Sequence, residues 1–187
     1  MKYLIAGLGN IGEKYQNTRH NIGFKILDAL AEASNISFED KRYGFIGQFK
    51  HKGRSFILLK PTTYVNLSGR AVNYWLKKEK VPLERLLVVV DDVSIPFGSI
   101  RIRPKGGDAG HNGLANISQV LGTNNYPRLR FGIGDDFPKG AQVNYVLGQW
   151  SLQEEEKLPE LTEHAAEMIK AFGTIGLELT MTRYNIK

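Results

Sequence analysis

The stretch Leu86-Leu87-Val88-Val89-Val90-Asp91-Asp92 decides the fold class of this 187-residue chain. An unbroken apolar run of this kind is typical of a strand that helices cover on both faces of a sheet. The run stops abruptly at two carboxylates. On either side of it, strand and helix patterns alternate along the whole chain, which indicates an α/β protein. We therefore predict one domain over residues 1–187, a mixed twisted sheet with helices on both faces.

The spacing of apolar residues and the turn residues give the approximate bounds of the other elements. Apolar positions 22, 26, 27 and 30 form one stripe of a helix, and Ser151 with Glu154 has the pattern of a capping box. The other signals are apolar strand patterns bounded by turns. The predicted strands are 3–8, 43–50, 55–59, 86–90, 100–103 and 129–133, and the predicted helices are 20–33, 66 or 68 to 78, a short helix ending at 121, and 151–172.

Composition narrows the possible functions. The chain has no cysteine, which excludes disulfides, thiolate metal sites and a cysteine nucleophile. Its longest apolar stretch, 86–90, is too short to cross a bilayer, and the apolar N-terminal run breaks into glycines, so we expect a cytoplasmic protein without a membrane partner. The net charge of +6 favours an acidic partner such as nucleic acid. Five basic residues and one acidic residue, Asp108, lie between positions 99 and 130: Arg101, Arg103, Lys105, Arg128 and Arg130.

Several polar residues fall where predicted strands end. Asn10 and Asp91 close two strands, and Asn66 follows a third. His20 begins a helix, and Asn112 ends the glycine-rich loop 105–113. Ligands of open α/β sheets bind outside the carboxyl ends of the strands, so these side chains are expected to converge on one crevice. Each residue taken alone has a simpler interpretation as a helix cap or turn former.

The residues also suggest three alternative kinds of site. Gly7, Gly9 and Gly12 match the dinucleotide-binding pattern, but the amphipathic helix begins only at Ile22 and not at the third glycine. His20, His111, Asp91 and Asp92 have the chemistry of metal ligands, although their spacing fits no compact ligand motif. A serine hydrolase needs a G-x-S-x-G elbow, which the chain lacks.

Six segments, in this order along the chain, resemble the successive signatures of bacterial-type peptidyl-tRNA hydrolases. The resemblance implies a monomeric α/β enzyme without metal or organic cofactor, which splits the ester between a peptide and its tRNA. The segments are Gly7–Asn10, Thr18–Gly23, Lys60–Gly69, Asp91–Asp92, Gly110–Leu114 and Arg128–Gly134.

The resemblance also assigns roles to individual residues. It places the general base on His20, with Asp91 as its carboxylate partner. Peptide-contacting amides fall on Asn10, Asn66 and Asn112, with Asn10 grouped among the catalytic residues, and tRNA-end contacts fall on Tyr15 and Tyr64. The basic group then has a site beside it, and Lys105 and Arg130 are its candidate RNA-binding members.

Three positions depart from the family pattern. Ile11 stands where proline is common, and Asp108 and Ala109 stand where small residues, often glycine, are usual. Asp108 adds a negative charge close to the expected path of RNA. Two other functions stay open at this point: a non-catalytic RNA-binding relative of the same fold, and a peptidase of related architecture.

Overall fold

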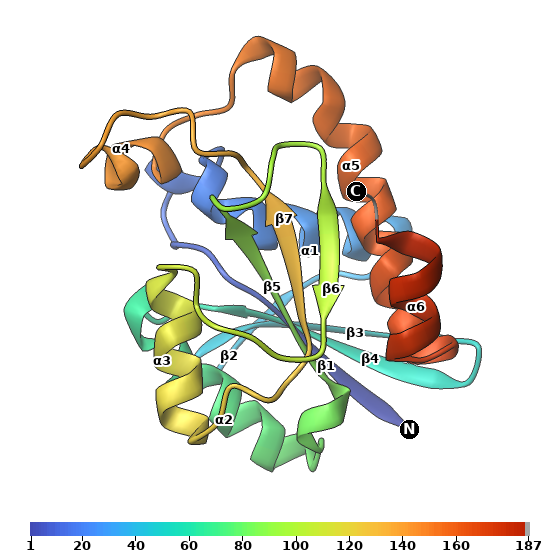
Figure 1. Ribbon diagram of the computed structural model, residues 1–187. Helices are drawn as coiled ribbons and strands as arrows, with labels where there is room; N and C mark the ends of the chain where they lie inside the picture. The colour runs from blue at the N-terminus through green and yellow to red at the C-terminus, as the bar shows by residue number, and fades with distance from the viewer. Residues whose placement is uncertain (186–187) are drawn as a thin grey trace.

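The apolar run forms an inner strand of a seven-stranded sheet. In the computed structural model, which describes residues 1–185, it is β5 (Leu86–Asp92), and every residue of β5 is buried. The strand order is β2-β3-β4-β1-β5-β7-β6 (Figure 1). β5 lies parallel to both of its neighbours, β1 (Lys2–Gly7) and β7 (Arg128–Gly132). A strand in this position has no solvent-facing side. Its sequence therefore does not alternate between apolar and polar residues.

The strands farther from the centre make the sheet mixed, as the sequence predicts. β4 (Arg54–Pro61) is parallel to β1, whereas β3 (Gly44–His51) is antiparallel to β4. The short strand β2 (Glu39–Lys41) pairs with β3 at one edge, and β6 (Ile100–Arg103) pairs antiparallel with β7 at the other edge.

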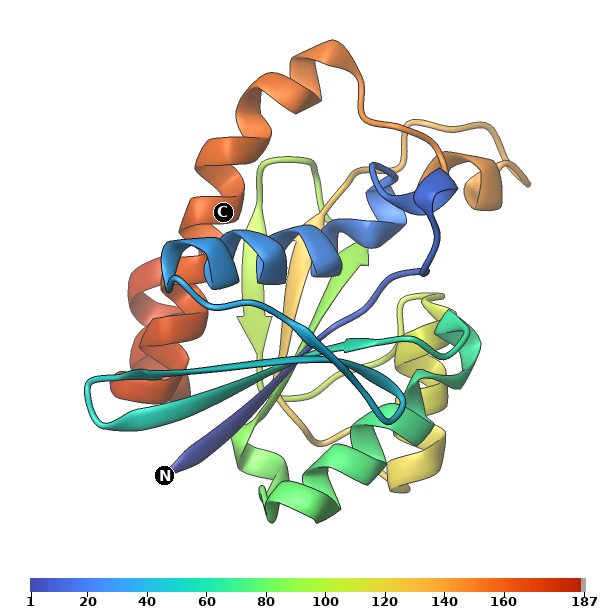
Figure 2. The ribbon, with the colours of Figure 1, turned by 180° about the vertical axis from the view of Figure 1, so that it is seen from behind.

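Helices cover both faces of the sheet (Figures 1 and 2). α1 (Ile22–Ala33), α5 (Leu152–Thr174) and α6 (Leu177–Tyr184) pack on the face that receives Leu87 and Val89. α2 (Ser68–Glu79) and α3 (Asn112–Leu121) pack on the opposite face, where Val88 and Val90 lie. The short helix α4 (Gln142–Val146) lies near the carboxyl ends of the central strands. The two helix layers thus bury opposite faces of the same strand.

Most of the predicted elements are confirmed, and the differences are local. The capping box is present, because Ser151 Oγ accepts from the Glu154 N–H at 3.2 Å and the Glu154 carboxylate accepts from the Ser151 N–H at 2.9 Å. The first helix was predicted from residue 20, but a 3-10 turn over Arg19–Asn21 precedes α1. β2, α4 and α6 were not predicted. Within the described residues, no helix combines the length and the apolar character needed to span a membrane.

The close approach of α1 to the sheet gives a test of the fold. A Cβ atom on Gly23 would lie 2.5 Å from the Leu8 nitrogen and 2.7 Å from the Val89 oxygen. Gly23→Ala should therefore lower the free energy of unfolding by about 1–3 kcal/mol, although alanine at an ordinary helix position stabilises by about 1 kcal/mol. Urea unfolding measures the change.

Gly107→Ala is the matched control for this substitution, since a Cβ atom there meets nothing within 4 Å. We expect its stability to stay within about 0.5 kcal/mol of the parent. If Gly23→Ala is as stable as the parent, α1 can move away from β1 and β5 without cost, and the position of its first turn is not fixed by this contact.

Candidate active site

A cavity of about 430 Å³ opens at the carboxyl ends of the central strands. β1 leads into α1 on one face of the sheet and β4 leads into α2 on the other, so the chain diverges between these strands and leaves a crevice. Six of the residues expected at the site line this one cavity: Asn10, His20, Tyr64, Asn66, Asp91 and Asn112. The expected convergence is thus present in the structure.

His20 and Asp91 form a directed pair at the base of the cavity. His20 Nδ1 lies 3.1 and 3.0 Å from the two carboxylate oxygens, and the side chains are 14% and 4% exposed. An ionised carboxylate only accepts hydrogen bonds, so Nδ1 of His20 carries a proton and donates it. The neutral ring therefore has its lone pair on Nε2, as a general base requires.

The environment shifts the protonation equilibria of both members of the pair. Burial alone lowers the pKa of His20, but the charge of Asp91 and its hydrogen bond to Nδ1 raise it more, and the net pKa lies above 6.5. Burial alone raises the pKa of Asp91, but the facing His20 and His111 rings outweigh it, and the net pKa lies well below the usual range. Asp91 thus stays ionised and stabilises an imidazolium at His20.

His111 is a member of this site that the sequence did not identify. Its Nδ1 accepts from the N–H groups of Gly113 and Leu114 at 3.1 and 3.2 Å, so the ring caps the N-terminus of α3. Because Nδ1 is an acceptor, the neutral ring has its proton on Nε2, which donates to Asp91 at 3.0 Å. From the sequence, His111 is a candidate metal ligand only. Its position beside Asn112 is the one other feature that points to this site.

The donor set does not suit a metal ion. His20, Asp91 and His111 do bring their ligand atoms within 4.8 Å of one another. However, a metal would need the lone pair of His111 Nε2, which carries a proton while Nδ1 caps α3. Asp92, the fourth candidate ligand, faces away and accepts from Ser94 and Arg130 instead. The arrangement fits hydrogen bonding rather than metal coordination.

Amide side chains supply the polar wall of the cavity. Asn21, which is buried, accepts from the N–H of Asn10 and donates to its carbonyl, both at 2.8 Å. These two bonds fix the main chain of Asn10, so its side-chain amide is available to a ligand in the cavity. Asn66 and Asn112 are exposed and line the same cavity. The role of Asn21 was missed, although it lies in the segment Thr18–Gly23.

Asp108 and Ala109, two of the departures from the family pattern, shape the glycine-rich loop. The Asp108 carboxylate accepts from the Gly110 N–H at 2.8 Å, and its main-chain oxygen accepts from the His111 N–H at 2.8 Å. Ala109 has φ of +51°, a conformation that favours glycine. Asp108 therefore closes the turn that delivers His111 to Asp91.

Two residues of the basic group, Arg128 and Arg130, make contacts inside the protein. Arg128 is fully buried, and its guanidinium donates to the carbonyls of Gly106, Asn124 and Tyr126. Arg128 was counted in the basic group from the sequence, but its guanidinium is used inside the protein; the exposure of an arginine cannot be read from its residue type.

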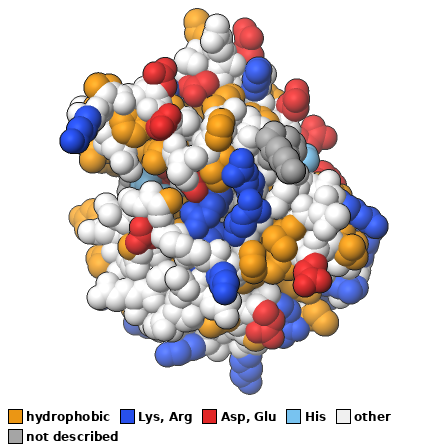
Figure 3. All heavy atoms as spheres, in the orientation of Figure 1, with side chains coloured by type: hydrophobic (Ala, Val, Ile, Leu, Met, Phe, Trp, Pro, Cys, Tyr) orange, Lys and Arg blue, Asp and Glu red, His pale blue; other side chains and the backbone are white. Residues whose placement is uncertain are grey.

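Arg130 is also largely buried. Its Nη1 pairs with Asp92 at 3.1 Å and its Nη2 donates to the Gly107 oxygen at 2.6 Å, so it holds the glycine-rich loop. Its contact with RNA stays a prediction. Lys105 is exposed, and Arg101 and Arg103 are half-buried on β6. Figure 3 shows Lys and Arg side chains gathered near the centre of the face that carries β6 and β7.

The two tyrosines expected at the tRNA end lie in different settings. Tyr64 lines the cavity and is 79% exposed, so its ring is free to stack on a ligand. Tyr15 is half-buried in the 3-10 turn Glu13–Tyr15 and does not line the cavity. Lys14 Nζ lies 4.9 Å from the centre of the Tyr15 ring.

α4 forms part of the cavity wall, through Gln142, Val143 and Val146. Arg19, next to the general-base candidate, donates to the Tyr145 oxygen at 3.0 Å, and its guanidinium lies 4.1 Å from the Tyr145 ring centre. The same guanidinium pairs with Glu154 at 3.0 Å. Arg19 therefore fastens α4 and the start of α5 to the turn that carries His20.

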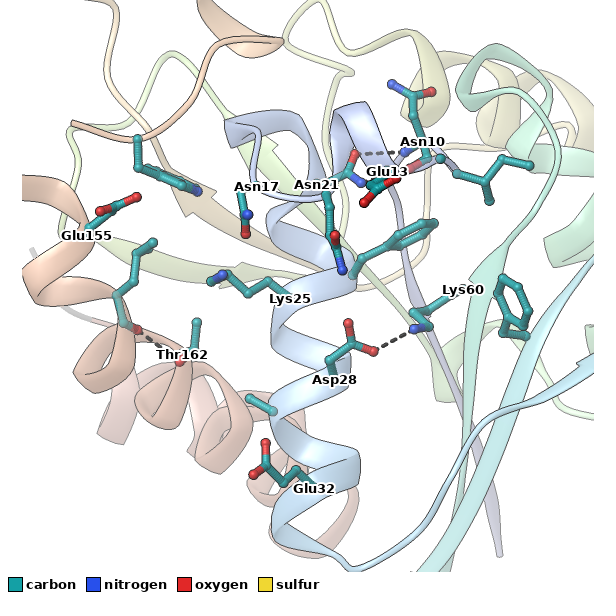
Figure 4. Close-up of a pocket in the computed structure, with 18 of the residues that line it drawn as sticks. Asn10, Glu13, Asn17, Asn21, Lys25, Asp28, Glu32, Lys60, Glu155 and Thr162 are labelled. Carbon is teal, nitrogen blue, oxygen red and sulfur yellow. Dashed lines mark hydrogen bonds and ion pairs between the residues drawn. The ribbon is translucent and has the colours of Figure 1, made fainter. Parts of the chain in front are cut away.

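A larger hollow, of about 930 Å³, lies elsewhere on the surface. It extends over α1, with Lys25 and Glu155 on one side of the helix and Glu13 and Lys60 on the other (Figure 4). Lys60 pairs with Asp28 there. It meets the cavity of about 430 Å³ only at Asn10 and contains neither His20 nor Asp91. The smaller cavity is therefore the candidate active site.

The fold and the site together define an α/β enzyme with a histidine positioned for general-base chemistry. The family model described as peptidyl-tRNA hydrolase matches residues 4–187. The chain therefore belongs to the peptidyl-tRNA hydrolase family. It is 57% identical to the peptidyl-tRNA hydrolase of Porphyromonas gingivalis over 99% of this chain and all of the relative, and 52% identical to that of Cytophaga hutchinsonii over the full length of both.

A solved structure agrees with this assignment. The crystal structure of peptidyl-tRNA hydrolase from Acinetobacter baumannii matches with a TM-score of 0.92 and 33% sequence identity, over 98% of this chain and 94% of that chain.

The His20–Asp91 pair predicts the pH dependence of the reaction. The pKa of His20 lies above 6.5 because of the Asp91 charge, so activity should fall as pH decreases through that raised value. Asp91→Asn removes the charge and leaves the burial, which lowers the pKa of His20 and moves the acid limb of the kcat/KM profile to lower pH. The activity itself should fall, but less than on loss of His20.

Asp92→Asn is the matched control, because Asp92 contacts Ser94 and Arg130 and not His20. It should leave the acid limb where it is. An acid limb that stays in place in the Asp91 variant as well would mean that this limb does not report His20.

Proposed function

We propose that the protein hydrolyses the ester between the peptide C-terminus and the 3′-terminal ribose of peptidyl-tRNA, with His20 as general base. The observation that carries this proposal is the placement of His20, whose Nδ1 is held by the buried Asp91 while its ring lines the cavity. The relatives at 52–57% identity over the full chain, which are named peptidyl-tRNA hydrolase, support the substrate.

In the proposed reaction, His20 first accepts a proton and then donates it. Nε2 takes a proton from water as the water attacks the ester carbonyl, and the imidazolium is stabilised by Asp91. The proton then passes to the ribose oxygen as it leaves, which regenerates the base. A positioned general base is typically worth roughly 10² to 10⁴ in rate. We assign to one of the asparagine amides of the cavity the donation of a hydrogen bond to the developing oxyanion, a contact worth roughly 10² to 10³ when lost.

The asparagine side chains give a physical basis for substrate choice. Each offers both a donor and an acceptor, which matches the amide groups of a peptide. An aminoacyl-tRNA presents an ammonium group where the peptide bond should lie, so partly buried donors of the site would lose their acceptors. Discrimination of this origin reaches roughly 10⁴. The enzyme would thereby spare aminoacyl-tRNA.

The tRNA portion of the substrate needs contacts that do not read sequence. Phosphate contacts from Arg101, Arg103 and Lys105 supply affinity of this kind. Tyr64, at the rim of the cavity, is placed to stack on the unpaired end of the RNA. We further propose that the protein acts as a monomer in the cytoplasm; sedimentation of the purified protein tests the first part.

Two rival functions fit the site less well. A non-catalytic RNA-binding relative has no need of a histidine held by a buried carboxylate, and here Asp91 has two imidazole partners. A peptidase acting on protein alone has no use for the basic group beside the cavity. Hydrolysis of peptidyl-tRNA, measured beside a peptide substrate, separates these functions.

Replacing His20 tests the proposed base directly. His20→Ala should lower kcat for release of labelled peptide from peptidyl-tRNA by at least roughly 10², because water loses its proton acceptor. Binding of tRNA should change little, since phosphate contacts supply most of the affinity. Activity within tenfold of the parent would remove His20 from this role.

Asn10→Asp tests substrate discrimination. A carboxylate accepts hydrogen bonds but does not donate when ionised, so the variant should lose its contact with the peptide carbonyl. It should also attract the ammonium group of an aminoacyl-tRNA. The ratio of kcat/KM for peptidyl-tRNA to that for aminoacyl-tRNA should fall, whereas a general folding defect lowers both values together. An unchanged ratio would assign discrimination to Asn66 or Asn112.

A further inference from the structure

A second basic surface lies on α2, outside the catalytic cavity. It forms a hollow of about 710 Å³. Together with the turn between β2 and β3, it presents four cations and two tyrosine rings, and we call it the α2 platform. Its members are Arg42, Tyr43, Arg70, Tyr74, Lys77 and Lys78.

The turn between β2 and β3 is fixed against α2. The indole nitrogen of Trp75 donates to the Arg42 oxygen at 2.8 Å, and the Thr62 nitrogen donates to the Tyr43 oxygen at 2.9 Å. Figure 2 shows this turn lying beside α2. Tyr43 has φ of +64°, which is uncommon for a bulky side chain and is held here by these contacts. The platform is therefore built before any ligand arrives.

The aromatic rings and the guanidinium of the platform are in mutual contact. Tyr43 and Tyr74 meet edge to face, with ring centres 5.4 Å apart. The Arg42 guanidinium lies 5.1 Å from the Tyr43 ring centre and 5.5 Å from that of Tyr74. Aromatic rings beside cations that track a backbone are the recurring elements of surfaces that bind unpaired nucleic acid.

The positive charge of the platform is not neutralised by the protein. Among residues 1–185, the ion pairs include none of Arg42, Arg70, Lys77 and Lys78. Glu79, the acidic residue of α2, pairs with Lys2 instead, at 3.1 Å. A cluster of unpaired cations favours a polyanion.

The platform is continuous with the rim of the catalytic cavity. Tyr64 and Asn66 line the cavity, and α2 begins at Ser68, directly after them. A helix rises about 1.5 Å per residue, so Arg70 lies near the rim and Lys78 about 12 Å farther along the axis. An RNA chain that leaves the cavity past Tyr64 therefore meets these cations in succession.

We propose that the α2 platform binds the RNA backbone of the substrate, as a second phosphate-contacting surface in addition to that of Lys105. The inference rests on the proposed hydrolysis of peptidyl-tRNA. The cations bind phosphates. Tyr43 and Tyr74 contact only RNA that lies directly against the protein. Because such contacts do not read bases, the platform serves different tRNAs equally.

The test compares two substrates with one double variant. Lys77→Glu with Lys78→Glu should lower kcat/KM for peptidyl-tRNA by about tenfold or more at low salt and reduce the slope of log kcat/KM against log salt by roughly 1 to 2. The kcat/KM for a peptidyl ester of a single nucleoside, which is too short to reach the platform, should stay at the parent value. This short ester also reports separately on the hydrolysis itself.

Two controls accompany this variant. Lys77→Arg with Lys78→Arg keeps the charge and should keep the parent activity. Lys50→Glu with Lys52→Glu makes the same change of charge at the other end of β3. A strand rises about 3.4 Å per residue, so that end lies roughly 20 Å from the turn between β2 and β3. The kcat/KM for both substrates should stay nearly at the parent value. The proposal is overturned if the Lys77 and Lys78 charge reversal leaves the activity ratio of the two substrates and the salt slope unchanged, as it would if the platform bound a protein.

Discussion

The burial of a charged carboxylate at the end of β5 is the constraint on which the site depends. Asp91 is 5% exposed and stays ionised, and an ion in that position needs hydrogen-bond donors around it. His20 supplies one donor from the 3-10 turn that precedes α1, and His111 supplies another from the N-cap of α3. Two helices on opposite faces of the sheet are thereby joined through a single side chain.

The two carboxylates that end β5 have different roles. Asp91 faces the cavity and sets the tautomer of His20. Asp92 accepts from Ser94 and from Arg130, and Arg130 in turn holds the carbonyl of Gly107 in the glycine-rich loop. Because that loop also closes through Asp108, its position is fixed from both ends, and His111 arrives at Asp91 in one orientation. Catalytic geometry and loop structure thus depend on adjacent residues of one strand.

Such an arrangement suits a reaction in which the protein supplies a base and donors rather than a covalent nucleophile. Fixed dipoles and a fixed base do not have to reorganise as charge develops in the transition state. The asparagines complete this environment, with Asn10 held by Asn21 at both main-chain groups. The proposed discrimination between a peptide amide and a free ammonium group requires the same rigidity.

The sequence by itself determined the fold class, nearly all of the sheet, the capping box of α5 and the convergence of His20, Asp91 and the asparagines, because these follow from local periodicity and from the order of the strand ends. It also identified the family, through six motifs in sequence. Only the tertiary structure showed that His111 donates to Asp91, that Arg128 is buried and that Asp108 closes a turn, because these depend on the environment of each side chain. His20 and Asp91 are 71 positions apart, and the hydrogen-bonding state of a histidine or the exposure of an arginine is set by such distant neighbours rather than by residue type.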